Sequence, residues 1–576
     1  MEMVEVIIDG KKVKVPKGTL ILEAAKKAQV NIPTLCYLED LTPQGACRVC
    51  VVEVEGESKL TASCMREVES GMVIHTNSPR VRKARKMIVE LLLSEHISDC
   101  PTCERAGSCE LLNLAYELGV TEVRFPPSQN LNKPKDTTSL SLIRDPNKCI
   151  LCGRCVRVCS QIQKVEAIKF VGRNIDLRVS AVMDKGLGNV QCTNCGQCLQ
   201  VCPVNAIKEK SALEEVWKNI EDPSKHVAVQ IAPSVRVSVG EELGFEPGEL
   251  VVKKIYTALR RLGFDAVFDT NFGADLTIVE EAWELTERIK NSTKPLPQLT
   301  SCCPGWIKFM EDFYPDLIPH VSSCKSPQQM LGALIKTYYA KEKGIPPEDI
   351  ISVSIMPCTA KKFEAERQEM SDSGFKDVDY VLTTREFVRM IKQARIDFKN
   401  LEETEADSVL GLYTGAGTIF GATGGVTEAA LRTAYFYLTG RNLEKVEFEE
   451  VRGMKGIKEA KVSIKDLEIR VAVAHGLGNA RKLLDQIREG KSPYHFIEIM
   501  ACPGGCVGGG GQPNGFDLKL RRKRAEGLYR EDKSLPWRYS HENPSIKTLY
   551  EKFLKRPGSE LSHKLLHTHY YKREYR

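Results

Sequence analysis

Alternating apolar and polar residues at the N-terminus predict two short strands over residues 4–15, joined by Asp9-Gly10, a dipeptide favoured in tight hairpin turns. Helix-like spacing follows over residues 20–29. Between residues 211 and 512, helix-like stretches alternate with short β-rich runs. We expect helices at 250–261, 280–290 and 328–343, and strands at 226–231, 350–355 and 469–473. This alternation predicts an α/β arrangement for the larger part of the chain.

Cysteine is the unusual part of the composition. The chain has 576 residues, enough for about four domains, and 21 of them are cysteines. The N-terminus lacks the apolar core of a signal peptide, and no apolar run approaches the roughly 18 residues of a membrane span. We therefore expect a cytoplasmic protein without a membrane span, whose cysteines are metal ligands or catalytic thiols rather than disulfide partners.

The cysteines divide the chain into two parts. Fifteen of the 21 lie within the first 202 residues, in four groups, and residues 203–301 contain none. The remaining six are Cys302, Cys303, Cys324, Cys358, Cys502 and Cys506. This distribution predicts a series of small metal-binding modules, followed by a large domain that gathers distant thiols at one point.

The C-terminal part carries a separate charge signal. Residues 511–576 contain 16 Lys and Arg against 8 Asp and Glu, in a chain whose net charge is +6. The basic run at 521–524 could bind nucleic acid, but no aromatic platform or nucleic-acid module accompanies it. We therefore interpret it as a solvated segment that packs its aliphatic stems against the main body. We interpret His563, His567 and His569 as solvated histidines and expect no nucleic-acid partner.

The first cysteine group follows the predicted hairpin and helix. Its ligand candidates are Cys36, Cys47, Cys50 and Cys64. Thiolates are soft anionic ligands that suit iron–sulfur clusters and zinc, and the spacing alone leaves both open. The strand–turn–strand–helix start and the long first loop resemble a plant-type [2Fe–2S] ferredoxin domain, although the middle cysteine spacing differs from the usual plant pattern.

The second group combines one imidazole with three thiolates. Its members are His96, Cys100, Cys103 and Cys109. A structural zinc site with the same four ligands stays open on spacing alone. The position of the group between two iron–sulfur modules favours a cluster. One histidine and three cysteines in this setting resemble the [4Fe–4S] site of complex I large subunits and of some hydrogenases.

The third and fourth groups form an internal repeat. Both read C-x2-C-x2-C-x3-C, and each cysteine of the first recurs 43 residues later. Pro203 completes the motif of bacterial two-cluster ferredoxins, in which the fourth cysteine ligates the other cluster. We therefore assign one [4Fe–4S] cluster to Cys149, Cys152, Cys155 and Cys202, and a second one to Cys192, Cys195, Cys198 and Cys159.

Three later segments hold most of the remaining cysteines. They read TSCCPGWIKFMEDFYP from Thr300, IMPCTAKKFEAER from Ile355 and FIEIMACPGGCVGGGGQP from Phe496. Four of their thiols could close one site: Cys303, Cys358, Cys502 and Cys506. Cys302 is expected to point elsewhere, because adjacent residues of an extended chain face opposite sides. The glycines around the last two cysteines allow backbone to approach a bulky ligand.

These three segments, in this order, resemble the H-cluster domain of [FeFe]-hydrogenases. With the front modules, the resemblance covers essentially the whole chain and matches the monomeric clostridial type. It implies a multidomain α/β and α+β fold, with ferredoxin-like iron–sulfur modules in front of a two-lobed α/β H-cluster domain. The implied domains are 1–80 ([2Fe–2S]), 81–130 (one His, three Cys), 131–210 (two [4Fe–4S]), 211–512 (H-cluster) and 513–576 (small-subunit-like).

The resemblance also implies a cofactor and its contacts. The four thiols would bind a [4Fe–4S] cluster, and Cys506 would bridge to a two-iron subcluster with CO, cyanide and a bridging dithiolate. Lys361, Pro233 and Ser234 would contact the cyanides, with Gln328 close by. Met356, Met500 and Phe420 would form an apolar wall of the cofactor site. The same three side chains would be equally expected in an ordinary hydrophobic core.

Proton supply is the remaining requirement of such a site. Cys302, as a thiol, titrates near enough to neutral to exchange protons, at about 8.5 when unperturbed. Glu281 and Glu284 share one helix face, with Arg288 four residues after Glu284. On their own these charges are typical of a solvated helix face. In the family, the proton relay corresponds to Cys302, a water, Glu281, Ser322 and Glu284, and all these side chains are present.

The resulting functional hypothesis is reversible reduction of protons to hydrogen. Electrons would come from ferredoxin or flavodoxin. Maturation enzymes would assemble the two-iron subcluster, and the protein would be a monomer or a homo-oligomer. An electron-conduit subunit would lack the TSCCPGW segment, and a hydrogen sensor or cytosolic iron–sulfur assembly factor would differ at the relay positions. An NAD-linked subunit would usually carry an extra cluster module after Cys506. Cys324 is expected to be a buried structural thiol.

Overall fold

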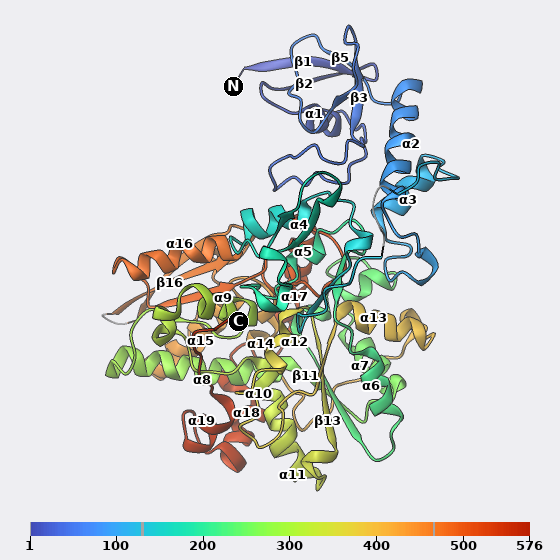
Figure 1. The fold of residues 1–576 in the computed structure, drawn as a ribbon. Helices are drawn as coiled ribbons and strands as arrows, with labels where there is room; N and C mark the ends of the chain where they lie inside the picture. Colours follow the sequence, from blue (N-terminus) through green and yellow to red (C-terminus); the bar gives the residue numbers. More distant parts are fainter. Residues whose placement is uncertain (1, 128–131, 465–466, 576) are drawn as a thin grey trace.

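The computed structural model describes residues 2–127, 132–464 and 467–575 (Figure 1). A small N-terminal lobe lies at one end of the molecule and a large α/β body at the other, with the short helices α4 (Arg154–Arg157) and α5 (Gln197–Gln200) between them. The domain boundary expected between residues 130 and 131 lies outside the described residues. Among those described, no helix combines the length and apolar character needed to cross a membrane.

The N-terminal lobe is built on one mixed sheet with the strand order β2-β1-β5-β3-β4. The predicted hairpin is confirmed, because β1 pairs antiparallel with β2 and Ile8 faces Lys11 across the turn. The predicted helix is also present and slightly shorter. The elements are β1 (Met3–Ile8), β2 (Lys11–Pro16), α1 (Ile21–Lys27), β3 (Val51–Val54), β4 (Thr61–Ala62) and β5 (Val73–His75).

The two-cluster module is a structural repeat as well as a sequence repeat. Two short helices, α4 (Arg154–Arg157) and α5 (Gln197–Gln200), each begin after a left-handed glycine with φ of 68°, Gly153 or Gly196. Two antiparallel ribbons complete it, β6 (Leu142–Arg144) with β9 (Ile207–Glu209), and β7 (Ile168–Val171) with β8 (Arg178–Ala181). The helices α2 (Pro79–Ser94) and α3 (Glu110–Glu117) connect this module to the N-terminal lobe.

The first sheet of the body is fully parallel, in the order β11-β10-β13-β14. It confirms the predicted strands at 226–231 and 350–355. Its strands are β10 (His226–Ile231), β11 (Ala266–Asp269), β13 (Ile350–Met356) and β14 (Tyr380–Thr383). Helices of this lobe are α6 (Leu213–Glu221), α7 (Val252–Leu262), α12 (Ala360–Ala365) and α13 (Thr384–Gln393).

The second sheet has the order β12-β17-β16-β15, with β15 antiparallel at its edge. Its strands are β12 (Gln298–Leu299), β15 (Ile457–Ile464), β16 (Leu467–His475) and β17 (Phe496–Met500). Other helices of the body are α9 (Pro304–Phe313), α14 (Gly415–Thr418), α15 (Gly425–Thr439) and α16 (Leu477–Arg488). Two sheets with helices on their faces give the two-lobed α/β body that the sequence predicted.

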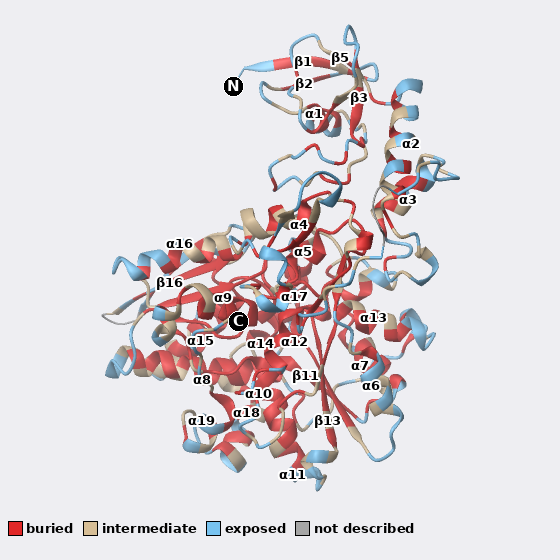
Figure 2. Cartoon of the chain, in the orientation of Figure 1, coloured by how far each residue is buried: buried red, intermediate tan, exposed pale blue. Residues whose placement is uncertain are grey.

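The central helices differ in extent from the sequence prediction. The helix expected at 280–290 is α8 (Thr270–Asn291), which starts ten residues earlier, where the Asp269 side chain caps it. Its first half is buried on every side, as Figure 2 shows, so no polar stripe marks it as a helix. The helix expected at 328–343 is divided into α10 (Pro327–Leu334), a π-helical turn at 335–339 and α11 (Ala340–Lys343).

The C-terminal segment is folded into the body, which corrects the solvated interpretation of its basic run. Its helices are α17 (Leu518–Ser534), α18 (Pro544–Leu549) and α19 (Glu560–Leu566). Arg521 and Arg524 are each 1% exposed, whereas Arg522 and Lys523 face solvent. Arg521 donates to the carbonyl of Pro503, and Arg524 pairs with Glu241. Helical periodicity therefore buries half of the run.

His567 is a second correction, because it is 3% exposed rather than solvated, while His563 and His569 are exposed.

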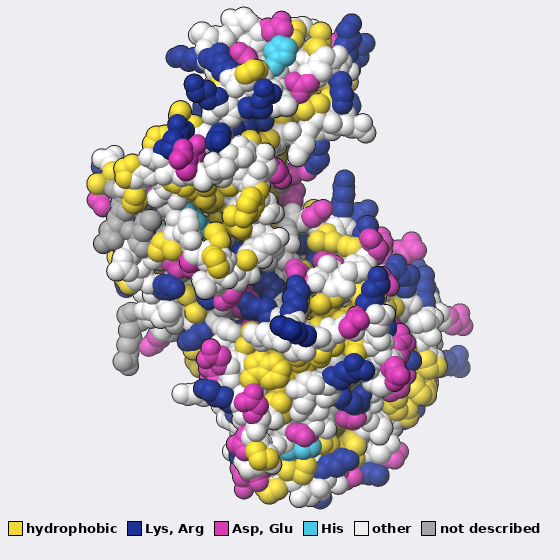
Figure 3. All heavy atoms as spheres, turned by 90° about the vertical axis from the view of Figure 1, so that its right-hand side faces the viewer, with side chains coloured by type: hydrophobic (Ala, Val, Ile, Leu, Met, Phe, Trp, Pro, Cys, Tyr) yellow, Lys and Arg dark blue, Asp and Glu magenta, His cyan; other side chains and the backbone are white. Residues whose placement is uncertain are grey.

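Charge is otherwise distributed as expected for a protein surface. On the face shown in Figure 3, Lys and Arg side chains are interspersed with Asp and Glu. Cys324 is fully buried, in agreement with its expected structural place.

Asp532 on α17 allows a test of how much the C-terminal segment contributes to the stability of the folded body. Its buried carboxylate accepts hydrogen bonds from Arg432 and Arg538. Asp532→Asn should destabilise the folded body by about 1.5–3 kcal/mol, because it removes the charge-assisted hydrogen bonds to Arg432 and Arg538, while Glu428 still pairs with Arg432. Differential scanning calorimetry of the full chain measures this, with the neighbouring exposed Lys533→Ala as control. Equal transition temperatures for the two variants would contradict it.

Candidate functional site

The central site forms where the carboxyl ends of parallel strands from both sheets meet. Pro233 and Ser234 follow β10, and Cys358 follows β13. Cys302 and Cys303 follow β12, and the segment with Cys502 and Cys506 follows β17. Loops at the carboxyl ends of such strands are the usual ligand sites of α/β folds. Sheet topology thus gathers cysteines that are about 200 residues apart in the sequence.

These loops enclose a cavity of about 70 Å³. All of the side chains that the sequence analysis grouped around the central cofactor line it. They are Pro233, Ser234, Cys302, Cys303, Gln328, Met356, Cys358, Lys361, Phe420, Met500, Cys502 and Cys506. The glycine-rich stretch after Tyr413 contributes Phe420 and Gly421 to the wall, as close packing rather than a phosphate cradle.

Cys302 and Cys303 both reach the cavity but belong to different cores. Cys302 packs with Phe420, Met500 and the α8 side, whereas Cys303 packs with Trp306 of α9. Burial raises the pKa of the Cys302 thiol well above its usual range. The thiol therefore holds its proton more firmly than the unperturbed value used in the sequence analysis suggests.

The residues around the cavity fit an iron–sulfur cofactor. Burial raises the pKa of Cys303 and Cys358, and brings that of Cys506 to about 12. Such thiols become thiolates when a metal compensates their charge, and thiolates are the ligands of iron–sulfur clusters. Ser234 adds a buried hydroxyl at the cavity wall whose oxygen has no hydrogen-bond partner within the described residues. That donor suits a polar group bound in the cavity.

Lys361 is held at the cavity by a partner that the sequence analysis missed. Its ammonium donates to Glu364 at 2.7 Å and to the Cys302 carbonyl at 3.2 Å. Burial alone would lower the pKa of Lys361, but Glu364 outweighs it and the pKa is raised. Lys361 thus stays cationic inside the cavity. The i, i+3 spacing of Lys361 and Glu364 on α12 was the available signal.

Gln328 is fixed by hydrogen bonds on both sides of its amide. Its oxygen accepts from Ser354 at 2.9 Å, and its nitrogen donates to Glu364 at 3.3 Å. Glu364 also accepts from Ser326 at 2.8 Å. One carboxylate therefore orients both polar side chains that α10 and α12 present to the cavity.

Glu281 is a carboxyl group that lies near Ser322 and Ser301 without a hydrogen bond of ordinary geometry to either. It is fully buried in α8, and neither of its oxygens has a hydrogen-bond partner within the described residues. Burial, with the nearby charge of Glu284, raises the pKa of Glu281 to about 8. A carboxyl group that titrates near neutral pH can both accept and release a proton.

Glu284, one turn further along α8, has the opposite environment. Burial would raise its pKa, but Arg288 at 2.7 Å and Lys294 at 3.0 Å bring it to about 2. Ser322 and Ser323 both donate to Glu284 Oε2 at 3.1 Å. Arg288 occupies its predicted place, whereas Lys294 and Ser323 were not foreseen. Two carboxyls with widely separated pKa values are typical of proton-transfer sites.

The thiols of the first cysteine group converge in the N-terminal lobe. All four are buried: Cys36, Cys47, Cys50 and Cys64. The sulfurs of Cys50 and Cys64 lie 3.4 Å apart, and Cys36 is close enough to Cys47 and Cys64 for its thiolate form to be stabilised by them. The loop between α1 and β3 and the short β4 region supply these side chains.

His96 is oriented as a ligand. It is 8% exposed, and its Nδ1 lies 3.0 Å from the carbonyl oxygen of Lys148. A carbonyl only accepts, so Nδ1 carries the hydrogen and Nε2 keeps a lone pair for a metal. Burial lowers the pKa of His96, which favours this neutral form. Lys148 also donates to Cys103 Sγ at 3.5 Å, near Cys109 at the start of α3.

The repeated motif forms cages with exchanged fourth cysteines. One small cavity is lined by the thiols of Cys149, Cys152, Cys155 and Cys202. Cys159 instead lies near Cys192 and Cys195, and burial, together with the charges of these two cysteines, raises its pKa. The thiol set of the first cavity is the one assigned from the sequence.

Direct contacts connect these groups with the central cavity. Arg157 donates to the carbonyls of Cys36 and Cys152, and Cys109 Sγ lies 3.9 Å from the Pro203 carbonyl. On the other side, Cys502 Sγ lies 3.9 Å from the Cys195 carbonyl. Here the backbones touch, because a Cβ on Gly510 would lie 2.7 Å from the Cα of Gly196.

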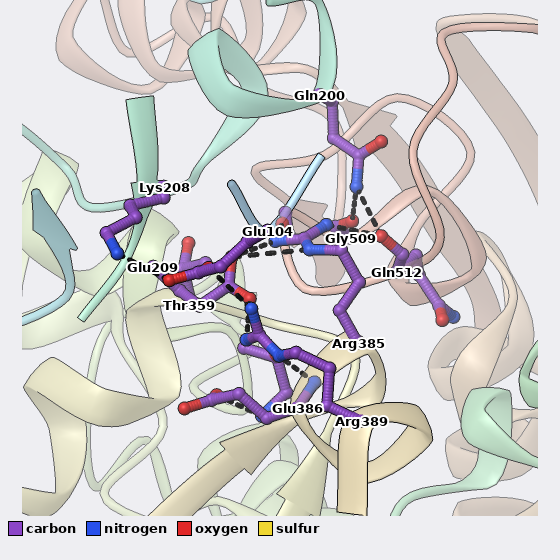
Figure 4. Close-up of polar contacts among 12 residues, drawn as sticks. Glu104, Gln200, Lys208, Glu209, Thr359, Arg385, Glu386, Arg389, Gly509 and Gln512 are labelled. Carbon is purple, nitrogen blue, oxygen red and sulfur yellow. Dashed lines mark hydrogen bonds and ion pairs between the residues drawn. The ribbon is translucent and has the colours of Figure 1, made fainter. Parts of the chain in front are cut away.

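An ion-pair network holds the front modules against the body (Figure 4). From α13, Arg385 and Arg389 pair with Glu209 at 2.8 and 2.6 Å, and Arg389 also pairs with Glu104. Gln200 of α5 donates to the carbonyls of Gly509 and Gln512 at 3.0 and 2.9 Å. The glycine loop after Cys506 is thus fixed by residues of the two-cluster module.

Five regions of the chain match models of known protein families. Residues 1–79 match a 2Fe-2S iron-sulfur cluster binding domain, 85–124 the NADH-ubiquinone oxidoreductase-G iron-sulfur binding region, and 148–206 a 4Fe-4S dicluster domain. Residues 225–510 match the iron only hydrogenase large subunit, C-terminal domain, and 518–573 the iron hydrogenase small subunit. The front matches favour iron–sulfur clusters over the zinc sites that cysteine spacing had left open.

Whole-chain similarity leads to the same family. The chain is 51% identical to "NADP-reducing hydrogenase subunit HndD" of Solidesulfovibrio fructosivorans, covering 100% of both chains. It is 44% identical to "Iron hydrogenase 1" of Clostridium pasteurianum over 99% of this chain and 100% of the relative. The solved [FeFe]-hydrogenase HydA1 of Chlamydomonas reinhardtii aligns at TM-score 0.57 and 46% identity, over 63% of this chain and 99% of that one. The chain therefore belongs to the [FeFe]-hydrogenase family, as an enzyme with accessory iron–sulfur domains.

Proposed function

We propose that this enzyme reversibly reduces protons to hydrogen at an H-cluster in the central cavity. The observation that carries the proposal is the convergence of buried thiols, a buried cation and an unpartnered hydroxyl on that one cavity. A carboxyl group that titrates near neutral pH lies behind it. When bound, the two-iron subcluster with its CO, cyanide and bridging dithiolate supplies the redox chemistry.

The protein residues hold and orient this cofactor. Cys303, Cys358, Cys502 and Cys506 would bind its [4Fe–4S] part, with Cys506 as the bridge. Lys361 and the unpartnered hydroxyl of Ser234 would donate to the cyanides, with Pro233 and Gln328 beside them. The side chains of Met356, Met500 and Phe420 would keep water out of the cavity.

Protons would move along α8 between the cavity and the outside. The proposed order is Cys302, a water, Glu281, Ser322 and Glu284, with Arg288 fixing the last carboxylate. The unpartnered oxygens of Glu281 support a bridging water between it and Cys302. Glu281 accepts a proton readily near neutral pH, whereas Glu284 releases one readily. Because of this difference in pKa, proton transfer from Glu284 to Glu281 would be downhill. Transfer in the other direction would need a protonated Glu284 that is short-lived and passes its proton on.

The front modules would conduct single electrons to the cavity. We assign one [2Fe–2S] cluster and three accessory [4Fe–4S] clusters to the domains proposed from the sequence, at 1–80, 81–130 and 131–210. The contacts of Arg157 and Pro203 support inputs from both outer clusters into the Cys149 group. The contact between Cys195 and Cys502 supports delivery to the H-cluster domain at 211–512, which the segment 513–576 completes.

The electron partner has two candidates. Ferredoxin or flavodoxin, acting on a cytoplasmic monomer or homo-oligomer, is the first. The second is an NADP-reducing assembly, favoured by the 51% identity to HndD over its full length. The alignment with that relative covers both chains over their full length, which supports the second candidate. Maturation enzymes would supply the two-iron subcluster in either case.

Infrared spectroscopy under anaerobic conditions tests the cofactor. The matured protein should show CO and cyanide stretching bands, because the proposed two-iron subcluster carries both ligands and the cavity offers Lys361 and Ser234 as donors to its cyanides. Cys506→Ser should lose these bands, since it removes the bridging thiolate, whereas the buried Cys324→Ser should keep them. Absence of the bands from matured wild-type protein would overturn the H-cluster proposal.

Cys302→Ala tests the proton relay. Turnover should fall by about 10²–10⁴-fold, because removing a positioned proton donor costs that much in general acid–base catalysis. Infrared bands should persist, since Cys302 is not a proposed iron ligand. Cys324→Ala removes another buried thiol from the same region and should keep wild-type turnover. Near-normal turnover of Cys302→Ala would mean that protons take another path.

Electron-donor assays separate the two partner candidates. The isolated enzyme should evolve hydrogen with reduced ferredoxin or flavodoxin and not with NADPH alone. Iron–sulfur clusters exchange single electrons, whereas nicotinamide transfers a hydride and needs a flavin to split the pair. Hydrogen evolution with NADPH alone would contradict this expectation. NADPH-dependent evolution that appears only with co-purifying chains would support the second candidate.

A further inference from the structure

Residues 566–568 pair with the segment that carries Ser322 of the relay and the adjacent Ser323. The amide of Lys325 donates to the carbonyl of Leu566, and the amide of Thr568 donates to that of Ser323, both at 2.7 Å. Cys324 and His567 form the bridge between these two hydrogen bonds. The segment that follows α19 thus pairs with residues 323–325, and its buried His567 contacts Glu280 of α8.

His567 makes one hydrogen-bond contact through each of its two ring nitrogens. Nδ1 lies 2.9 Å from Ser323 Oγ, and Nε2 lies 3.2 Å from Glu280 Oε2. The Ser323 hydroxyl also lies 3.1 Å from Glu284 Oε2. A continuous hydrogen-bonded path therefore runs from Glu280 through His567 and Ser323 to the outermost carboxylate of the proposed relay.

Several titratable or charged groups surround the imidazole. Glu280 and Glu284 face it from α8, with Lys294 paired to Glu284. The ring of His563 stacks on it at 4.7 Å between centroids, from the exposed side of α19. The other groups near it are Tyr550, which donates to Glu280, and the Cys324 thiol.

The hydrogens available to these groups can be counted. Glu280 is fully buried and accepts from Tyr550, Ser562 and the amide of Gly558. Burial would raise its pKa, but His567, Ser562 and Tyr550 outweigh burial and lower it. Glu280 is thus an acceptor only, and Nε2 of His567 must carry a hydrogen.

Nδ1 then decides the direction of the Ser323 hydroxyl. In the neutral ring Nδ1 has no hydrogen, so Ser323 must donate to it and turns away from Glu284. In the charged ring Nδ1 donates to Ser323, whose single hydrogen is then free for Glu284. One hydroxyl hydrogen serves one of two acceptors, and the charge of His567 selects which.

We propose that His567 is a positioning residue that sets the proton affinity of Glu284 through Ser323. This inference rests on the proposed role of Glu284 in the relay. With His567 charged, Glu284 has one more donor and holds a proton less firmly. With His567 neutral, it loses that donor and its proton affinity rises, because hydrogen bonds to a carboxylate favour the ionised form.

His567→Gln tests the proposal. The amide has the spacing of the two ring nitrogens, so its NH₂ can donate to Glu280 while its oxygen accepts from Ser323. The variant should therefore hold the neutral arrangement at every pH. In the pH profile of Glu284 protonation, followed by the infrared band of its carboxyl group, the acid limb should move upward by about one pH unit, the effect of one hydrogen bond to a charged group.

Ser323→Ala provides the matched control, because it removes the hydroxyl that transmits the effect. It should shift the acid limb in the same direction, and adding His567→Gln to it should change nothing further. His563→Gln, at the exposed stacked ring, should keep the wild-type profile. Infrared bands and iron content should match the wild type in all variants, which separates a relay effect from misfolding or lost cofactor.

Two results overturn the inference. One is a wild-type pH profile for His567→Gln with intact cofactor. The other is an additional shift when His567→Gln is combined with Ser323→Ala. Glu284→Gln identifies failure of the underlying relay instead. If that variant keeps wild-type turnover, the proposed path itself is wrong; if it loses turnover while His567→Gln is unchanged, only the role of His567 fails.

Discussion

The free energy needed to ionise a buried thiol constrains the rest of the structure. A thiol in a closed cavity ionises only when a cation compensates it, and burial raises the pKa of Cys303, Cys358 and Cys506 accordingly. The ligands must therefore be rigidly placed around a space of cluster size. Strand ends from two sheets supply the rigidity, and glycines let the chain turn between ligands. Gly505, with φ of 87°, has no room for a Cβ, which would lie 2.7 Å from the Thr423 amide.

Much of this organisation was predictable because its signals are local. The hairpin at Asp9, the repeated cysteine motif and the three cysteine segments are each contiguous in the sequence. The hairpin is present, and the cysteines of the motif and of the segments line cavities in the fold. Features that depend on tertiary packing were missed. The first half of α8 has no polar face to reveal it, and burial of Arg521 follows from its contact with Pro503, which only the folded chain brings near.

The place of the C-terminal segment in the candidate site was also not predictable from the sequence alone. Composition alone made it a basic, solvated tail with three histidines. In the fold its helices close the body, and one of those histidines lies against the carboxylate that ends the proposed relay. The opposite environments of Glu281 and Glu284 likewise arise from distant groups. Lys294 follows the helix, and Ser322 and Ser323 come from the next segment. Helical spacing predicted that the two carboxyls share a face, but not that their proton affinities differ.

The contact between Gly196 and Gly510 has a consequence for speed rather than for stability. Electron tunnelling between two centres slows steeply as the gap between them widens. Where these glycines meet, backbone touches backbone, beside Cys195 on one side and the loop after Cys506 on the other. Even a methyl group on either residue would push the two protein parts apart at the last step of the proposed electron path. On that path the absence of side chains at Gly196 and Gly510 would set the electron-transfer rate, because it would determine how close donor and acceptor come.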